Sequence, residues 1–164
     1  MLHNLGLCKI LIQKAVKANA SCLFLPEATD YISSSAEESL SLVRSVDESP
    51  FVLGLQKEAK ENKISINVGI HEPGDIGKKI KNTSIWIDDT GKITQRYQKL
   101  HLFDVDIKGG PYLKESDSIE KGMSILPPFS TPVGRVGLMI CFDVCRSTLA
   151  IVTYNALTFS ASIS

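Results

Sequence analysis

The chain has 164 residues, of which 43% are hydrophobic and 22% are charged, and its 18 Lys and Arg residues balance 18 Asp and Glu residues. This composition is typical of a globular protein and excludes a disordered or fibrous chain. The zero formal charge leaves no basic surplus for nucleic acid or for an anionic membrane, so we expect a small-molecule substrate or a protein partner.

The cysteine pattern and the apolar segments indicate in which cellular compartment the protein is expected. The four cysteines fall into two distant pairs without the C-x-x-C spacing of a zinc or redox site: Cys8, Cys22, Cys141 and Cys145. Lys9, Gln13 and Lys14 interrupt the first apolar segment, which therefore lacks the unbroken core of a signal peptide. No run approaches the ~20 apolar residues of a membrane span. Free thiols in a reducing compartment fit best, so we expect a cytoplasmic protein.

The first third of the chain is predicted to contain helices and one strand. Apolar residues recur every three or four positions over 5–16, which predicts an amphipathic helix. The apolar run 21–27 predicts a short buried strand stopped by a proline, so that Glu27 stands at its C-terminal end. Two further helices are predicted at 35–46 and 50–62, the second of which begins with a proline.

The remainder of the chain is predicted to consist mainly of strands, at 63–70, 82–88, 91–98, within 129–141 and at 155–160. The second and third of these form a hairpin across Asp-Thr-Gly at 89–91, and Lys99 follows the hairpin directly. A loop rich in Gly and Asp over 103–118 leads to a second hairpin, which turns at 133–134. A short helical piece is expected after Cys141.

The order of these elements indicates the fold class. Helices that alternate with apolar strands predict an α/β fold in which helices pack on one face of a mixed sheet. The length of 164 residues fits a single domain, 1–164. No internal repeat, low-complexity tract or linker divides the sequence.

Three reactive side chains follow predicted strand ends. Cys141 comes directly after an apolar strand, where the next backbone N–H can point at a bound oxygen. Glu27 follows a buried strand, and a half-buried carboxylate there can accept the proton of a thiol. Lys99 also follows a strand, and a cation beside a thiol lowers the pKa of that thiol and stabilises an oxyanion. Together they have the residue types of a nucleophile, a base and an electrophile.

Each of these residues also has a purely structural explanation. Cys141 fits a buried apolar cysteine, because cysteine is among the commonest core residues. Glu27 fits a surface acid or an acid at a helix N-terminus, and Lys99 fits a solvated lysine. Glu115 is a surface acid by the same reasoning. Spacing along the sequence does not decide whether the side chains meet.

Four stretches resemble the nitrilase, or carbon-nitrogen hydrolase, superfamily, and most of all its fungal deaminated glutathione amidase branch: FLPEATDYI, YQKLHLFDVD, GGPYLKES and VGRVGLMICFDV. The resemblance runs from Leu5 to about Ser160. It implies a partial α-β-β-α sandwich and a Glu-Lys-Cys triad, which falls on Glu27, Lys99 and Cys141. It also implies that Glu115 assists the triad or positions the substrate.

The resemblance implies acyl transfer through a thioester, with release of ammonia from a small amide such as deaminated glutathione. The backbone N–H of Phe142 is expected to hold the oxyanion together with Lys99. No cofactor and no metal are implied, and His3, His71 and His101 are expected to be ordinary polar or loop residues. Family members usually pair, so a homodimer is an open alternative to a monomer.

Two departures from the family pattern keep alternatives open. Family members usually continue after the nucleophile with Arg-Phe-Pro-Glu, whereas this chain continues with Val144-Cys145-Arg146. They also begin with a strand before the first helix and extend well beyond this length, so the resemblance implies an incomplete domain. A catalytically inactive homologue is therefore one alternative. Another is a different enzyme of the superfamily, such as an omega-amidase acting on 2-oxoglutaramate or a nitrilase proper, because the triad is shared.

Overall fold

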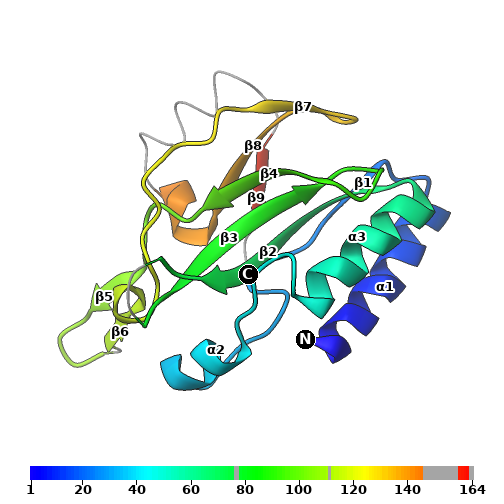
Figure 1. Cartoon of the computed structure of the whole chain (residues 1–164). Helices are drawn as coiled ribbons and strands as arrows, with labels where there is room; N and C mark the ends of the chain where they lie inside the picture. The colour runs from blue at the N-terminus through cyan, green and yellow to red at the C-terminus, as the bar shows by residue number, and fades with distance from the viewer. Residues whose placement is uncertain (76–77, 111, 146–158, 163–164) are drawn as a thin grey trace.

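A computed structural model describes residues 1–75, 78–110 and 112–145, and the backbone of 159–162. Helices α1 (Leu2–Lys17) and α3 (Pro50–Asn62) lie side by side on one face of a sheet, as Figure 1 shows. The apolar stripe of α1 is buried there, as its periodicity predicts. Ser49 caps the N-terminus of helix α3, because its side chain accepts a hydrogen bond from the backbone N–H of Val52. The helices thus form as predicted because their apolar faces cover the sheet.

Helix α2 (Ala36–Leu42) is shorter than the predicted segment 35–46. It begins as expected, because the Ser35 side chain accepts a hydrogen bond from the backbone N–H of Glu38. It ends early because Val43 adopts an extended conformation and packs against Ile80 and Ile119. Packing between distant segments outweighs the local helical pattern here.

The main sheet contains β1 (Cys22–Phe24), β2 (Ser65–Pro73), β3 (Ile80–Ile87) and β4 (Ile93–Gln98), in the order β1-β2-β3-β4. Strands β1 and β2 are parallel and the other neighbours are antiparallel, so the predicted mixed sheet is confirmed. After β1 the chain continues along β2, because Leu25 donates a backbone hydrogen bond to Asn67 and Thr29 donates one to Gly69. This path carries Glu27 along the edge of β2.

The turn between β3 and β4 lies where the sequence predicts it. The carboxylate of Asp88 accepts hydrogen bonds from the backbone N–H groups of Thr90 and Lys92 and from the Thr90 hydroxyl. Burial alone would raise the pKa of Asp88, but these hydrogen bonds outweigh it and lower the pKa. Gly91 supplies the positive φ of 84° that the turn requires.

A second sheet contains β7 (Phe129–Thr131), β8 (Gly134–Ile140) and β9 (Phe159–Ser162), with β8 paired to both neighbours. The turn of its hairpin falls at 132–133, one residue earlier than predicted, because the Thr131 hydroxyl bonds across it to Gly134. The predicted last strand at 155–160 overlaps β9 only at its end, and 155–158 lie outside the described residues. After β8, the short helix η2 (Cys141–Cys145) forms as expected.

Two apolar cores hold three layers together. One core lies between α1, α3 and the main sheet, and the other lies between the main sheet and the second sheet. Trp86 and Tyr97 of the main sheet meet Met139 and Ile140 of β8 in the second core. The described chain is thus an α-β-β arrangement, in agreement with a partial α-β-β-α sandwich (Figure 1). The helices of the described chain are all too short or too polar to cross a bilayer.

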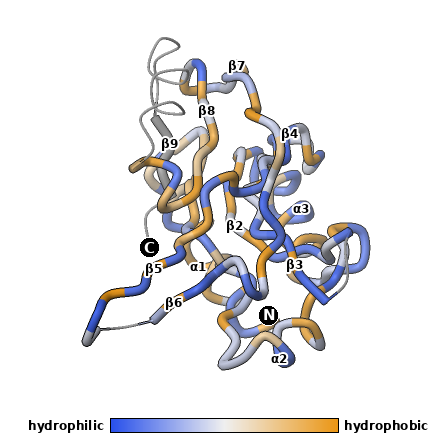
Figure 2. Tube along the Cα trace, turned by 90° about the vertical axis from the view of Figure 1, so that its left-hand side faces the viewer, coloured by the Kyte–Doolittle hydropathy of each residue, from blue (hydrophilic) through white to orange (hydrophobic). Residues whose placement is uncertain are grey.

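The segment 103–118, predicted as a loop, contains a small hairpin. Its strands are β5 (Asp104–Asp106) and β6 (Tyr112–Lys114), and a single helical turn, η1 (Glu115–Asp117), follows them. The hairpin projects from the body of the protein, as Figures 1 and 2 show. Its sequence lacks a strong apolar alternation, so the pattern could not predict it. It returns the chain to the sheet edge at Glu115.

Candidate active site

The structure brings together the side chains that the sequence singles out. Glu27 follows β1, Lys99 follows β4 and Cys141 follows β8. The first two strands belong to the main sheet and the third to the second sheet. Glu115 reaches the same place from the start of η1. The four side chains therefore converge from both sheets and from the projecting hairpin.

Lys99 is the centre of this cluster. Its Nζ lies 3.0 Å from Oε1 of Glu27 and 3.0 Å from Oε2 of Glu115. The side chains are only 3%, 12% and 17% exposed, respectively. Burial alone would lower the pKa of Lys99, but the carboxylates of Glu115 and Glu27 outweigh it and raise the pKa. Lys99 is therefore a buried ammonium ion at neutral pH.

Glu115 is held by the backbone as well as by Lys99. Its Oε2 accepts a hydrogen bond of 2.6 Å from the N–H of Phe103, just before the projecting hairpin. The N–H of Glu115 donates in turn to the carbonyl of Phe103. The two ends of the hairpin are thus fastened to each other beside Lys99. The hairpin missed by the sequence pattern is what fixes Glu115 in the cluster.

Asn82 also belongs to the cluster, although no motif in the sequence marks it. Its Nδ2 donates hydrogen bonds to Oε1 of Glu27 and, at 3.5 Å, to Oε1 of Glu115. Asn82 is buried in β3, and its Oδ1 contacts no hydrogen-bond donor in the described part of the chain. Asparagine is depleted in strands, so its presence inside a predicted strand is the one feature of the sequence that could have marked Asn82 as a functional residue. The amide links the two carboxylates that face Lys99.

Cys141 occupies a strained turn at the end of β8. Its φ of 46° is in the left-handed region, which a residue with a side chain rarely adopts. Glu27, Lys99 and the backbone N–H of Phe142 all lie close enough to the half-buried thiol to shift its pKa. Burial, followed by the charge of Glu27, raises the pKa of the thiol, while Lys99 acts against this increase. Cys141 is therefore a neutral thiol at neutral pH, in contact with a carboxylate.

The carboxylate of Asp30 ties the backbone that follows Glu27 to strand β2. Asp30, which is buried, accepts hydrogen bonds from the backbone N–H and from Nδ1 of His71 in β2. Ala28, next to Glu27, has a φ of 53°. His71, expected to be an ordinary polar residue, is thus a partner of the segment that carries Glu27.

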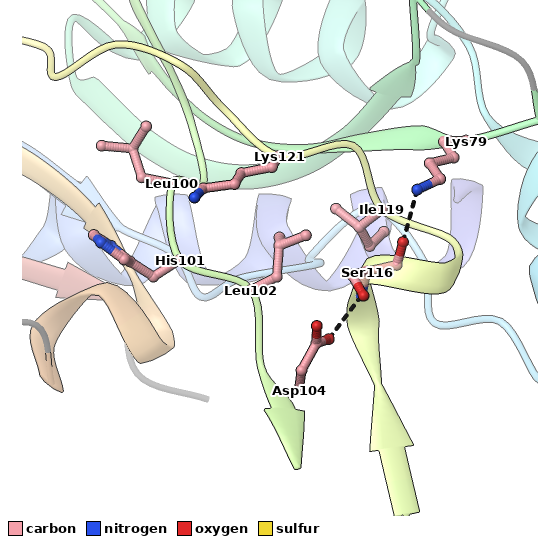
Figure 3. Close-up of a pocket in the computed structure, with 8 residues that line it drawn as sticks. All are labelled: Lys79, Leu100, His101, Leu102, Asp104, Ser116, Ile119 and Lys121. Atoms are coloured by element: carbon pink, nitrogen blue, oxygen red, sulfur yellow. Dashed lines mark hydrogen bonds between the residues drawn. The ribbon is translucent and has the colours of Figure 1, made fainter. Parts of the chain in front are cut away.

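A cavity of about 280 Å³ lies beside the cluster. Figure 3 shows its lining residues: Lys79, Leu100, His101, Leu102, Asp104, Ser116, Ile119 and Lys121. One part of this wall follows Lys99 in the chain and another part follows Glu115. None of Glu27, Lys99 and Cys141 lines it, so the cavity is formed by chain neighbours of Lys99 and Glu115 and does not open onto the thiol. Within the described ranges, no group of three or more His, Cys, Asp or Glu side chains is arranged to hold a metal ion.

The sequence of the chain is similar to a protein-family model and to curated proteins. A model of the carbon-nitrogen hydrolase family matches residues 2–156. The chain is 43% identical over 145 residues to the probable hydrolase nit2 of Schizosaccharomyces pombe, covering 88% of this chain and 52% of that protein. It is 36% identical over 147 residues to a deaminated glutathione amidase of Rattus norvegicus, covering 87% of this chain and 44% of that protein. The chain thus spans about half the length of these relatives.

Solved structures give the same result for the fold. The C. elegans NitFhit protein matches all of this chain with a TM-score of 0.90 and 29% identity, and 40% of that protein is covered. An amidase from Nesterenkonia sp. AN1 matches 99% of this chain with a TM-score of 0.81 and 19% identity, and 61% of it is covered. The predicted fold class is therefore confirmed. Because the carbon-nitrogen hydrolase family model matches residues 2–156, the chain belongs to the carbon-nitrogen hydrolase family of the nitrilase superfamily.

Proposed function

We propose that this chain carries the acid, amine and thiol of a cysteine-dependent amidase, which hydrolyses the carbon–nitrogen bond of a small amide and releases ammonia. The observation that carries the proposal is the meeting of Cys141, Glu27 and Lys99 from three different strand ends. A thiol beside a largely buried carboxylate and a buried ammonium ion has the parts that nucleophilic acyl transfer requires.

In the first step, Glu27 takes the proton of Cys141 as the sulfur attacks the amide carbon. The raised pKa of the thiol makes a base necessary, because little thiolate forms unaided at neutral pH. The carboxylate of Glu27 acts on the thiol at close range, so it can accept the proton of Cys141. Glu27 therefore has the position of a general base.

The tetrahedral intermediate carries an oxyanion that needs fixed positive partners. Lys99 supplies a charge that remains in place because two carboxylates raise its pKa. The N–H of Phe142, which lies close to the sulfur, supplies a backbone dipole. Protonation by Glu27 then releases ammonia and leaves an acyl thioester on Cys141. This step requires no metal or organic cofactor.

Water completes the cycle. Glu27, again a carboxylate, takes a proton from the attacking water and returns it to the sulfur, which leaves as the thiol while the acid product forms. Glu115 assists without touching the reacting atoms, because it holds the other side of the Lys99 ammonium. Glu27 can therefore take up and release protons while the ammonium of Lys99 stays paired with the carboxylate of Glu115.

Deaminated glutathione is the substrate that we propose. Its support is the identity of 32–36% to proteins called deaminated glutathione amidase in rat, mouse, cattle, human and Dictyostelium discoideum. The triad does not distinguish this amide from 2-oxoglutaramate, so an omega-amidase activity is the second candidate. The choice between the two amides depends on the residues that contact the acyl group of the substrate.

The test is ammonia release from each amide by the wild-type chain and by Cys141→Ala, measured on the same day with matched protein. We expect ammonia from the wild-type chain with deaminated glutathione, a lower rate with 2-oxoglutaramate, and none from Cys141→Ala. Equal ammonia from both proteins would remove the catalytic role of Cys141 and favour the inactive homologue. A higher rate with 2-oxoglutaramate would reverse the choice of substrate.

A further inference from the structure

Asp143 is a fully buried carboxylate two residues after Cys141, and four donors converge on it. Its Oδ1 accepts hydrogen bonds of 2.8 Å from the backbone N–H and from Nδ1 of His101. Its Oδ2 accepts a hydrogen bond of 2.7 Å from the hydroxyl of Tyr97 and one of 3.1 Å from the N–H of Ile140. Each oxygen thus receives two donors.

These donors surround the reactive residues in the chain. Tyr97 precedes Lys99 by two residues and His101 follows it by two, while Ile140 directly precedes Cys141. Lys99 follows the main sheet and Cys141 follows the second sheet. Asp143 therefore joins the two segments that place the ammonium and the thiol, across the boundary between the sheets.

A carboxylate is the side chain that this arrangement requires. An ionised Asp has two oxygens that accept about four hydrogen bonds and no hydrogen to donate. The Tyr97 hydroxyl remains a donor, because burial and the neighbouring carboxylate of Asp143 raise its pKa. An asparagine of the same size would turn an NH₂ group toward one of the two pairs of donors. The site is thus specific for charge as well as for shape.

We propose that Asp143 is a positioning residue that holds the Cys141 turn against Glu27 and Lys99. The assignment rests on the proposed function, in which Glu27 is the base for Cys141. Without Asp143, the turn after β8 loses its ties to Tyr97 and His101, and the sulfur moves away from the carboxylate. Contact between Glu27 and Cys141 is therefore the quantity that should change.

The experiment measures that contact without relying on catalysis. Iodoacetamide alkylates the thiolate, and fragment ions in tandem mass spectrometry place the label on Cys141 rather than on the other three cysteines, so the pH midpoint of its alkylation reports its pKa. Glu27 raises this pKa through its charge, so Glu27→Gln should lower the midpoint. We expect the shift caused by Glu27→Gln to fall by at least half in an Asp143→Asn background.

Three control variants separate positioning from loss of stability. Asp88→Asn removes a carboxylate that also accepts three hydrogen bonds, but in the β3–β4 turn away from the cluster. It should lower thermal stability and leave the Glu27→Gln shift unchanged. His101→Leu removes the donor at Nδ1, whereas the amide of His101→Asn can replace it, so the shift should fall in the first and recover in the second.

The outcomes distinguish the two proposals. An unchanged Glu27→Gln shift in the Asp143→Asn background would overturn the positioning role and leave the proposed function standing. If Glu27→Gln alone does not shift the pH midpoint of Cys141 alkylation, Glu27 does not act on Cys141, and both proposals are overturned. If circular dichroism finds Asp143→Asn unfolded, the two His101 variants decide the question, and equal shifts in both would refute the assignment.

Discussion

Gly69 lies directly beneath Glu27, so that a Cβ atom at Gly69 would stand 2.6 Å from the Cα of Glu27. The carbonyl of Pro26 and the N–H of Ala28 would lie almost as close. These neighbours are backbone atoms, which cannot rotate away as a side chain would. The close approach of the two segments thus depends on the absence of a side chain at Gly69.

Gly69→Ala should displace Glu27 from Cys141 and Lys99. A displacement of about 1 Å in a catalytic group costs on the order of a hundredfold in rate, and overpacking costs about 1–3 kcal/mol of stability. We expect both losses, measured as ammonia release and as the free energy of unfolding in urea. Gly6→Ala in α1 is the control, because its Cβ meets nothing within 4 Å and should stabilise the chain by about 0.5–1 kcal/mol. Equal behaviour of the two variants would refute the argument.

Lys99→Met should be one of the most destabilising single substitutions in the chain. It leaves the carboxylates of Glu27 and Glu115 buried without their cation, and removal of one partner of a buried ion pair costs about 3–5 kcal/mol. Adding Glu115→Gln should recover part of the loss, because one unpaired charge is removed. Denaturation in urea measures each step.

The control for Lys99 is an exposed pair of the same chemistry. Lys57 and Glu61 face each other at 3.8 Å with side chains 68% and 56% exposed. Exposed pairs of this kind contribute about 0.3–0.5 kcal/mol on a helix. Lys57→Met should therefore be nearly neutral. A loss as large as that of Lys99→Met would mean that burial does not govern the difference.

The stabilising effect of Lys99 should depend on pH in one direction. The folded protein raises the pKa of Lys99 above its ordinary value of 10.5, so folding favours the protonated form. The contribution is complete below pH 10.5 and disappears as the pH rises through the folded pKa. The difference in free energy of unfolding between wild type and Lys99→Met should thus be flat near neutrality and decrease in strong alkali. A difference that grows with alkaline pH would contradict the assignment.

Two neighbouring buried residues of β3 should respond in opposite ways to loss of their polar groups. Asn82→Leu removes a donor from the carboxylates of Glu27 and Glu115, which should cost about 1–3 kcal/mol of stability and reduce ammonia release. The Oγ1 of Thr83 has no hydrogen-bond partner within the described residues. Thr83→Val keeps its shape, so it should be neutral or stabilising. Thermal unfolding of the two variants measures the contrast.

The strands could be predicted from the sequence because short apolar runs mark them, and their ends gave the positions of Glu27, Lys99 and Cys141. Whether those residues act in catalysis stays a prediction. Asp143 could not be predicted, because its partner Tyr97 is 46 residues away along the chain and no local pattern marks the pair. The same holds for the early end of α2, since Val43 leaves the helix for contacts with distant residues.

The cluster is divided between two sheets, and this has a consequence for the order in which the site forms during folding. A folding intermediate with only the main sheet formed would hold Glu27, Lys99 and Asn82 but would leave the sulfur as an ordinary free thiol. The cysteine acquires its neighbours only when the sheets close over Trp86, Tyr97 and Met139. Pulsed alkylation of Cys141 during refolding would therefore time the docking of the sheets, and no half-formed molecule could expose a working nucleophile.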